Sequence, residues 1–308
     1  MANLDLKQTK LNGWLIVDKP LNISSNHVLT KLKRQFNIKK LGHAGTLDPL
    51  ASGVLVVAVG EATKLCRYAI SDDKSYEFTV QFGDSTDTDD AEGDVIASNQ
   101  LPLPKSEVIS AALEQFIGAI QQVPPRYSAI KINGRRSYDI ARKGLDNNAE
   151  SPAKPSAREV VINTFELTNH DTAQRQASFR VHCGKGTYVR SLARDLAHAL
   201  GSYGYVLKLR RIASGIFNLS QATTLDNLLK LSYTDLAQLM LGVDCVLDDI
   251  PVHQLTTSEQ QAVICGKAIT LPPNFVSNQM VRAKAAGKLV AILLPKGNLW
   301  QPQRVFNL

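Results

Sequence analysis

The stretch GHAGTLDPLASG at residues 42–53, followed by the apolar run VLVVAVG at residues 54–60, determines the fold of this chain. The run predicts a buried strand, and the glycines before it allow a tight backbone path and close approach of a ligand. Pro49 disfavours a helical conformation at Asp48, so this carboxylate is predicted to lie on extended or turn backbone. Such loops often hold reactive groups against a rigid strand. The alternative is a structural turn in which Asp48 only caps the backbone, and for Leu-Asp-Pro taken alone that interpretation is the better one.

A second distinctive stretch, HCGKGTYVR at residues 182–190, is predicted to pass from a strand into a helix through a Gly-Lys-Gly turn. Free amides and positive charge at the start of a helix could hold a phosphate. The GxxxxGK[ST] spacing of a nucleotide-binding loop is absent, because Lys185 is followed by Gly186. Tyr188 and Arg190 fall in the first helical turn, where both could reach the strand edge. The alternative is a capped turn with Tyr188 in the core and Arg190 in solvent.

Around these stretches the hydrophobic pattern predicts both strands and helices. Apolar residues alternate with polar ones at residues 76–82, and apolar residues at helical spacing follow Ser24 and Ser25. Further strands are predicted at residues 13–17, 159–167, 176–183 and 289–294. Further helices are predicted from Ser106 to Ile120, from Thr187 to Leu200, at residues 221–241 and at residues 256–265, with a surface loop at residues 144–157. The pattern changes near residue 250, which predicts a domain at 1–249 and a small β-rich domain at 250–308.

The composition excludes several classes of protein. Of the 308 residues, 44% are hydrophobic, which is enough to form a core and argues against wholesale disorder. No apolar run approaches the length of about 20 residues that a membrane span needs. The N-terminus has no apolar signal region, so we expect a cytoplasmic protein without membrane attachment. The four cysteines lie far apart and form no CxxC pair, which supports neither a zinc knuckle nor a disulfide framework.

Charge is unevenly distributed along the chain, whose net charge is +7. Residues 175–211 hold eight basic residues and one acid, whereas residues 84–94 hold six acids and no base. A further segment at 126–143 holds one acid and six basic residues, which are Arg126, Lys131, Arg135, Arg136, Arg142 and Lys143. Separated basic segments suit a polyanion such as nucleic acid if the fold brings them to one face. The alternative is a set of unrelated solvated surfaces. The acidic segment is predicted to be a surface turn.

A set of motifs recurs in order along the chain. They are Gly13–Pro20, Gly42–Lys64, Lys74–Tyr76, Gly83–Gly93, Pro124–Lys131, Gly134–Gly144, Gly184–Arg190 and Leu209–Gly215. Together they resemble the bacterial tRNA pseudouridine synthase B family over residues 11–248. Residues 250–308 match only loosely, as the PUA-like tail of such enzymes. One departure is Asn22-Ile-Ser-Ser25, where the family usually has Gly-x-Thr-Ser; because Asn tolerates a left-handed turn and Ser keeps the hydroxyl, we expect little loss of function.

This resemblance implies an α+β fold with a mixed, largely antiparallel central sheet flanked by helices. The small β-rich, PUA-like domain at 250–308 would bind RNA. The family isomerises uridine-55 in the T loop of tRNA: the nucleotide is flipped out, its glycosidic bond is broken, and the uracil is rejoined through C5. The resemblance therefore implies a monomer whose partner is the T stem-loop of tRNA, with no cofactor and no metal.

The resemblance also assigns roles to three catalytic residues. Asp48 is the catalytic aspartate, acting either as a nucleophile or as a base at the sugar C2′. Arg190 is the cation that keeps Asp48 ionised. Tyr76 stacks on uracil and relays the C5 proton, although without the resemblance it would be interpreted as a buried strand aromatic.

Substrate-binding roles follow for other residues. His43 would fill the gap left by the flipped base, rather than bind a metal, because no other ligand falls at a matched spacing. Tyr188 would form a wall of the pocket and Leu209 would contact the base, although Leu209 could equally be plain core. Lys19 would orient the loop or the RNA. The six basic residues of the 126–143 segment would contact tRNA phosphates.

Two other functions fit parts of the same sequence. One is a tRNA-binding or folding module that has lost catalysis, although Asp48, Tyr76 and Arg190 are all present. The other is a nucleoside glycosidase, a class that usually needs two positioned carboxylates, whereas only Asp48 stands out.

Overall fold

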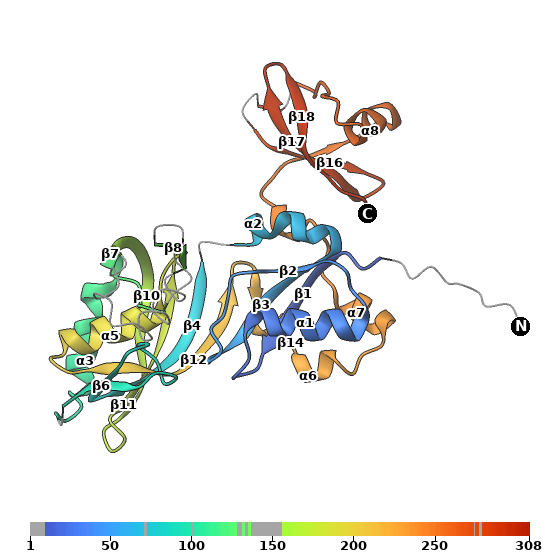
Figure 1. Cartoon of the computed structure of the whole chain (residues 1–308). Coiled ribbons are helices and arrows are strands. Elements are labelled where there is room, and N and C mark those ends of the chain that lie inside the picture. Colours follow the sequence, from blue (N-terminus) through green and yellow to red (C-terminus); the bar gives the residue numbers. More distant parts are fainter. Residues whose placement is uncertain are drawn as a thin grey trace, which may run out of the picture.

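A computed structural model describes residues 10–70, 73–99, 101–127, 131–132, 135–136, 156–273, 275–276 and 279–308. Its main feature is a ten-stranded sheet, in which the strand order is β14-β1-β3-β12-β4-β11-β10-β7 and β2 and β13 pair with β3 and β12 (Figure 1). The strands are β1 (Gly13–Lys19), β2 (Leu41–Ala44), β3 (Ala51–Val59), β4 (Lys74–Phe82), β7 (Gly118–Gln122), β10 (Arg158–Asp171), β11 (Gln176–Cys183), β12 (Gly204–Ser214), β13 (Phe217–Asn218) and β14 (Thr223–Thr224). Only the β1–β14 and β3–β12 pairs are parallel. The predicted fold class is therefore confirmed.

Strand β3 is the buried centre of one half of the sheet. Every residue from Gly53 to Val59 is buried, as its continuous apolar pattern predicts. β3 pairs with β1 and β2 in antiparallel fashion and with β12 in parallel fashion. Since β12 in turn pairs with β4, the start of β3 at Ala51 lies across β12 from Phe78, in the middle of β4.

Helices cover the face of the sheet that carries the alternating apolar residues. Helix α5 (Val189–Ala199) packs on β12 and β4, and α3 (Ser106–Leu113) packs on β10. Under them, the ring of Phe179 lies 5.4 Å from each of the rings of Phe78 and Phe165. At the other half of the sheet lie α1 (Ser25–Phe36), α6 (Leu225–Leu228) and α7 (Tyr233–Leu239) (Figure 1). Ser24 caps α1 as predicted, and Asn22 has φ of 63°, the left-handed turn expected there.

Two predicted helices are wrong in part. The helix that begins at Ser106 ends at Leu113, and after a 3-10 turn (Glu114–Phe116) the chain becomes edge strand β7 instead of remaining helical to Ile120. The chain is already extended at Ile117, Gly118 then begins β7 with φ of 93°, and pairing with β10 replaces the lost helical hydrogen bonds. The helix predicted at residues 221–241 is divided into β14, α6 and α7. Ser232 forms a capping box that starts α7 separately.

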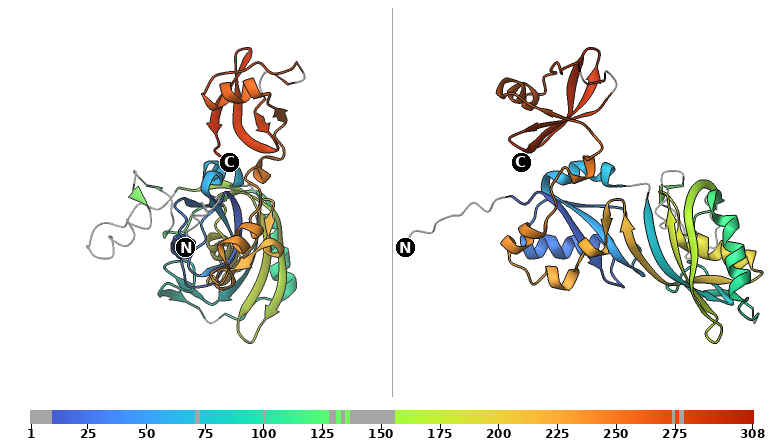
Figure 2. Two further views of the ribbon diagram at one scale, coloured as in Figure 1. Left: turned by 90° about the vertical axis from the view of Figure 1, so that its right-hand side faces the viewer. Right: turned by 180° about the vertical axis from the view of Figure 1, so that it is seen from behind.

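A second, four-stranded sheet follows the first. It contains β15 (Val252–Gln254), β16 (Val281–Ala285), β17 (Lys288–Lys296) and β18 (Leu299–Val305), with α8 (Thr257–Ile264) beside it. Figure 2 shows it standing over α2 (Cys66–Ala69). Its Leu289, Ile292 and Phe306 belong to one hydrophobic cluster with Trp14 and other residues of the first sheet. Throughout the described part of the chain, no helix is both long and apolar enough to cross a membrane.

Polar contacts also join the two sheets. Lys64 donates to the carbonyl of Val305 at 2.7 Å, and the carboxylate of Glu61 accepts from the amide of Asn307 at 3.0 Å. Both residues lie in the 3-10 helix (Gly60–Leu65) that directly follows β3. The second sheet is therefore anchored at the far end of β3.

We predict that Phe179→Ala lowers the free energy of unfolding by about 3–5 kcal/mol, because a fully buried ring between two other rings leaves a cavity. Urea denaturation followed by circular dichroism measures the loss. Val161→Ala is the control: Val161 is 44% exposed, and its truncation should change stability by only about 0.5 kcal/mol. Equal losses in the two variants would contradict this account of the core.

Candidate active site

The loop that carries Asp48 is fixed through its backbone. The hydroxyl of Ser25, at the start of α1, accepts from the amide of Leu47 at 2.8 Å and donates to its carbonyl at 3.0 Å. The ammonium of Lys19 donates to the carbonyl of Pro49 at 3.3 Å. With its neighbours on both sides held in this way, the Asp48 side chain is 40% exposed.

Lys19 lies beneath this loop and is fully buried. Its ammonium also donates to the carbonyls of Pro20 and Ile23, both at 2.8 Å. Burial lowers the pKa of Lys19 to about 8, and the negative charge of Asp48 partly opposes this change. The geometry therefore places Lys19 against the loop backbone and away from the surface that RNA could reach.

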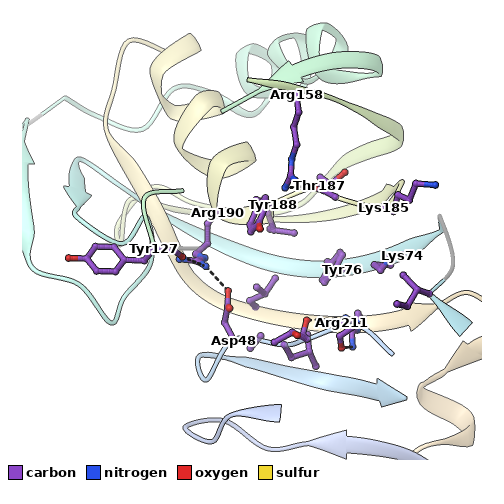
Figure 3. A pocket seen from close by; sticks show the side chains of 18 residues that line it. Asp48, Lys74, Tyr76, Tyr127, Arg158, Lys185, Thr187, Tyr188, Arg190 and Arg211 are labelled. Atoms are coloured by element: carbon purple, nitrogen blue, oxygen red, sulfur yellow. Dashed lines mark hydrogen bonds and ion pairs between the residues drawn. The ribbon is translucent and has the colours of Figure 1, made fainter. Parts of the chain in front are cut away.

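Arg190, on α5, joins this helix to the Asp48 loop, to the acidic segment at 84–94 and to the segment that carries Tyr127. Its side chain is 7% exposed and lies 2.9 Å from the carboxylate of Asp48 and 3.4 Å from that of Asp90. It also donates to the carbonyls of Thr88 and Tyr127, each at 3.0 Å. Figure 3 shows Arg190 pointing from α5 toward Asp48 across the pocket. The guanidinium fork therefore holds one accessible carboxylate and one buried carboxylate together.

The start of α5 is itself positioned by a buried side chain. Tyr188 precedes the helix and provides no side-chain cap. The amide side chain of Gln122, which is fully buried at the end of β7, accepts from the Tyr188 amide at 2.8 Å and donates to its carbonyl at 3.1 Å. This pair fixes the turn from which both Tyr188 and Arg190 project.

The acidic segment at 84–94 is more than the surface turn that the sequence predicts. It begins with β5 (Asp84–Thr86), which pairs with β6 (Val95–Ser98) directly after the segment, and both Asp89 and Asp90 are buried. Asp89 lies 2.9 Å from Arg194, one helical turn beyond Arg190. Burial raises the pKa of Asp89, and the charge of Arg194 opposes this change. The two acids therefore neutralise two arginines of α5, of which Arg190 is buried and Arg194 is half-buried.

A pocket of about 510 Å³ opens between Arg190 and strand β4. Tyr76 is buried along one side, where burial raises the pKa of its phenol and the charge of Arg211 opposes this change. The guanidinium of Arg158 lies 4.8 Å over the ring of Tyr188 at the opposite wall. Figure 3 shows these side chains converging from β4, β10, β12 and α5. A cavity of this size, with a carboxylate at its mouth and aromatic walls, is suited to a small planar group.

The pocket brings together five of the seven residues predicted for catalysis and for substrate binding. The pocket lining includes Asp48, Tyr76, Tyr188, Arg190 and Leu209. His43, on β2, is half-buried and lies outside that lining. Its Nδ1 is buried with no hydrogen-bond partner in the described part of the chain.

The predicted phosphate contacts are only partly described. Arg126 is exposed, just before Tyr127. Lys131 lies in strand β8 (Lys131–Ile132), and Arg135 and Arg136 form β9 (Arg135–Arg136). Arg142, Lys143 and most of the loop predicted at residues 144–157 lie outside the described residues.

Three residues near the site were not singled out by the sequence. Asp90 was hidden within a run of acids, and Arg158 stands alone in front of a predicted strand. Arg211 lies in the motif Leu209–Gly215, yet its charge alone would predict a solvated side chain. The alternation of buried and less buried residues along β12 is the pattern that could have identified Arg211, because it puts Arg211 on the same inward face as Leu209.

Known proteins match this chain over nearly its whole length. A family model described as TruB family pseudouridylate synthase (N terminal domain) matches residues 33–189, and one described as tRNA pseudouridylate synthase B C-terminal domain matches residues 190–248. A tRNA pseudouridine synthase B of Bradyrhizobium diazoefficiens is 42% identical over 306 residues, which cover 97% of this chain and 86% of the relative. One of Caulobacter vibrioides is 39% identical over 312 residues, which cover 98% of each chain.

Solved structures share the fold. A chain in the crystal structure of a Cbf5–Nop10–Gar1 complex superposes with a TM-score of 0.71 at 23% identity, covering 96% of this chain and 85% of that one. A chain of an H/ACA RNP bound to a substrate RNA containing 2′-deoxyuridine superposes with a TM-score of 0.68 at 22% identity, with the same coverage. Together, the fold and the matched models define a pseudouridylate synthase, an enzyme that isomerises uridine in RNA. Within that class, the chain belongs to the TruB family.

We predict that the imidazole of His43 titrates below its ordinary pKa of 6.5, because burial and then the positive charge of Arg211 lower this pKa. The unfolded chain then binds the proton more tightly than the folded one. The stability contributed by neutral His43 is therefore present above pH 6.5 and is lost as the pH falls through the folded pKa. Nuclear magnetic resonance titration measures this pKa, with the resonance assigned by its loss in His43→Gln. A value at or above 6.5 would refute the prediction.

Proposed function

We propose that this chain converts uridine-55 in the T loop of tRNA to pseudouridine, with Asp48 as the catalytic carboxylate. Its TruB family membership and its relatives named tRNA pseudouridine synthase B support tRNA as the RNA. The observation that carries the proposal is the ion pair of 2.9 Å between Asp48 and the nearly buried Arg190, at the mouth of a pocket bordered by Tyr76.

The reaction rearranges bonds without a net gain or loss of electrons. The N1–C1′ bond breaks with its electron pair left on N1, so uracil is detached as an anion. After the ring rotates, C5 supplies the electron pair of the new C5–C1′ bond. The proton on C5 then leaves and N1 gains one. The chain must therefore provide an ionised carboxylate, a pocket that retains uracil, and a group that handles the C5 proton.

The site supplies each of these. Arg190 holds the carboxylate of Asp48 at the pocket, where it can attack carbon or remove the C2′ proton. The pocket holds the detached ring between Tyr76, Tyr188 and Leu209, and the Tyr76 phenol relays the C5 proton. A cavity of about 510 Å³ has room for the ring to turn while its walls keep the detached uracil close to the sugar.

The uridine must leave its stack before it can meet Asp48. Flipping a nucleotide costs a few kcal/mol, which contacts in the pocket must offset. His43 lies at the end of β2, close to the Asp48 loop, where a neutral ring could stack on the bases that the flipped nucleotide leaves behind. Recognition then depends on the shape of the loop and on its splayed bases.

Basic residues extend from the pocket toward the RNA backbone. Arg158 and Lys185 lie on the pocket wall and Arg126 is exposed near its mouth. The other basic residues of the 126–143 segment would continue this path along the phosphates. Residues 250–308, the proposed second domain, would extend the grip on tRNA beyond the T loop. Such contacts make the affinity depend on salt.

We predict that Asp48→Asn abolishes turnover and leaves tRNA affinity nearly unchanged, because the amide keeps the shape of the carboxylate but cannot act as base or nucleophile. The assay incubates the chain with an unmodified T stem-loop and maps pseudouridine in the product, while filter binding measures affinity. Retained turnover would exclude Asp48 as the catalyst. With the wild-type chain, unchanged but bound RNA would support a binding module, and free uracil would support a glycosidase.

We predict that Asp90→Asn lowers the single-turnover rate by about 10-fold or more, because Arg190 loses its buried carboxylate and no longer holds Asp48 in place. Asp89→Asn is the matched control: Asp89 is also buried, but its carboxylate pairs with Arg194 instead of Arg190. Its rate should stay within about threefold of wild type, because small misplacements matter only near the reacting atoms. Equal losses of rate in the two variants would contradict this account, because they would reflect a general effect of removing a buried carboxylate from this segment.

A further inference from the structure

We propose that Arg211 is a positioning residue that ties the phenol of Tyr76 to the loop carrying Asp48, so that a single guanidinium fixes both sides of the reacting uridine. This inference rests on the proposed function. Arg211 is 1% exposed and lines the same pocket as Tyr76 and Asp48. Figure 3 shows it between the start of β4 and the Asp48 loop.

The guanidinium is held by backbone oxygens on two sides. Its Nε donates to the carbonyl of Val54 on β3 at 2.8 Å. Its terminal nitrogens donate to the carbonyls of Gly45 at 3.1 Å and Thr46 at 3.5 Å, both shortly before Asp48. Arg211 also lies directly opposite Tyr76 in the antiparallel pairing of β12 with β4, and both residues line the pocket. Arg211 thereby connects β3, β4 and the Asp48 loop.

The glycines of the loop make room for this contact. Gly45 has φ of 90°, and a Cβ there would lie 3.3 Å from a terminal nitrogen of Arg211. Gly53 has φ of 99°, and a Cβ there would lie 2.1 Å from the carbonyl oxygen of Arg211. Two glycines of the stretch at 42–53 therefore serve the close approach of this one arginine.

The charge of Arg211 has no acidic partner. Among the described residues no carboxylate forms an ion pair with Arg211, whereas its neighbour Arg210, on the opposite face of β12, lies 2.7 Å from Asp18. Burying a cation without a counter-ion costs stability. Lys19 and His43 are close enough for the charge of Arg211 to lower their pKa values as well. Arg211 therefore lowers the stability of the folded chain and is still present beside the pocket. This points to a role of its charge in the reaction.

Two steps of the reaction need what this cation supplies. The phenol of Tyr76 must face C5 when the proton leaves that carbon, and Arg211, its partner across the β12–β4 pair, positions the phenol. Positive charge also makes it easier for the phenol to lose its proton, because it opposes the rise in the pKa of Tyr76 that burial causes, and the phenolate form can then take up the C5 proton. Asp48 must meanwhile lie on the sugar side, and the bonds to Gly45 and Thr46 fix its loop.

The test compares Arg211→Gln and Arg211→Lys with the control Arg210→Gln. We expect both Arg211 variants to lower the single-turnover rate about 10-fold or more while changing tRNA affinity by less than about twofold, as positioning groups do. Arg210→Gln should keep the wild-type rate. A loss confined to affinity, or an equal loss in the control, would overturn the proposal. Absence of wild-type product would overturn the proposed function along with it.

A spectroscopic arm does not depend on turnover. The absorbance titration of the chain minus that of its Tyr76→Phe variant reports the phenol of Tyr76. Removing Arg211 should move this titration to higher pH, because the cation that opposes the effect of burial is lost. Circular dichroism checks folding, and Arg211→Met, which also removes the charge, replaces Arg211→Gln if the latter does not fold. An unchanged titration in a folded variant would overturn the link to Tyr76.

Discussion

The site depends on one nearly buried guanidinium, that of Arg190, placed between two carboxylates. Burying Arg190 is favourable only if opposite charge is buried with it, and the acidic segment at 84–94 provides that charge through Asp90. The same group then holds Asp48, which is partly open to solvent. An apparently unrelated acidic hairpin, the first turn of α5 and the loop before β3 therefore form one electrostatic unit. The loss of any one of these would leave a charge without its partner.

Much of the fold could be predicted from local patterns. The continuous apolar run of β3, the alternation along β4 and the cap at Ser24 act over a few residues, and the structure has them as predicted. The errors arose where a distant partner decides the outcome. Gly118 alone does not show that the following residues pair with β10, some 40 residues later. Likewise, the apolar pattern at residues 221–241 does not show that the predicted helix is interrupted, because the interruption depends on the pairing of β14 with β1.

The candidate site shows the same limit. The order of the motifs along the chain was enough to predict that Asp48, Tyr76 and Arg190 belong to one site. The structure places all three at one pocket. The roles of Asp90 and Arg211 follow only from three-dimensional neighbours. Asp90 is one acid among six in its segment, and what distinguishes it is an arginine 100 residues away. Arg211 and Arg210 are adjacent in sequence and opposite in environment, because a strand turns alternate side chains to alternate faces.

The shared hydrophobic cluster between the two sheets has a consequence for how the molecule is handled. Leu289, Ile292 and Phe306 complete a core that also contains Trp14. A truncated chain that ends near residue 250 would expose the apolar surface around Trp14 to water. Poor solubility of such a fragment would then result from the loss of the residues that bury this surface. Work on isolated halves would then report the behaviour of an exposed interface, and the intact polypeptide is the smallest unit in which β3 has support at both of its ends.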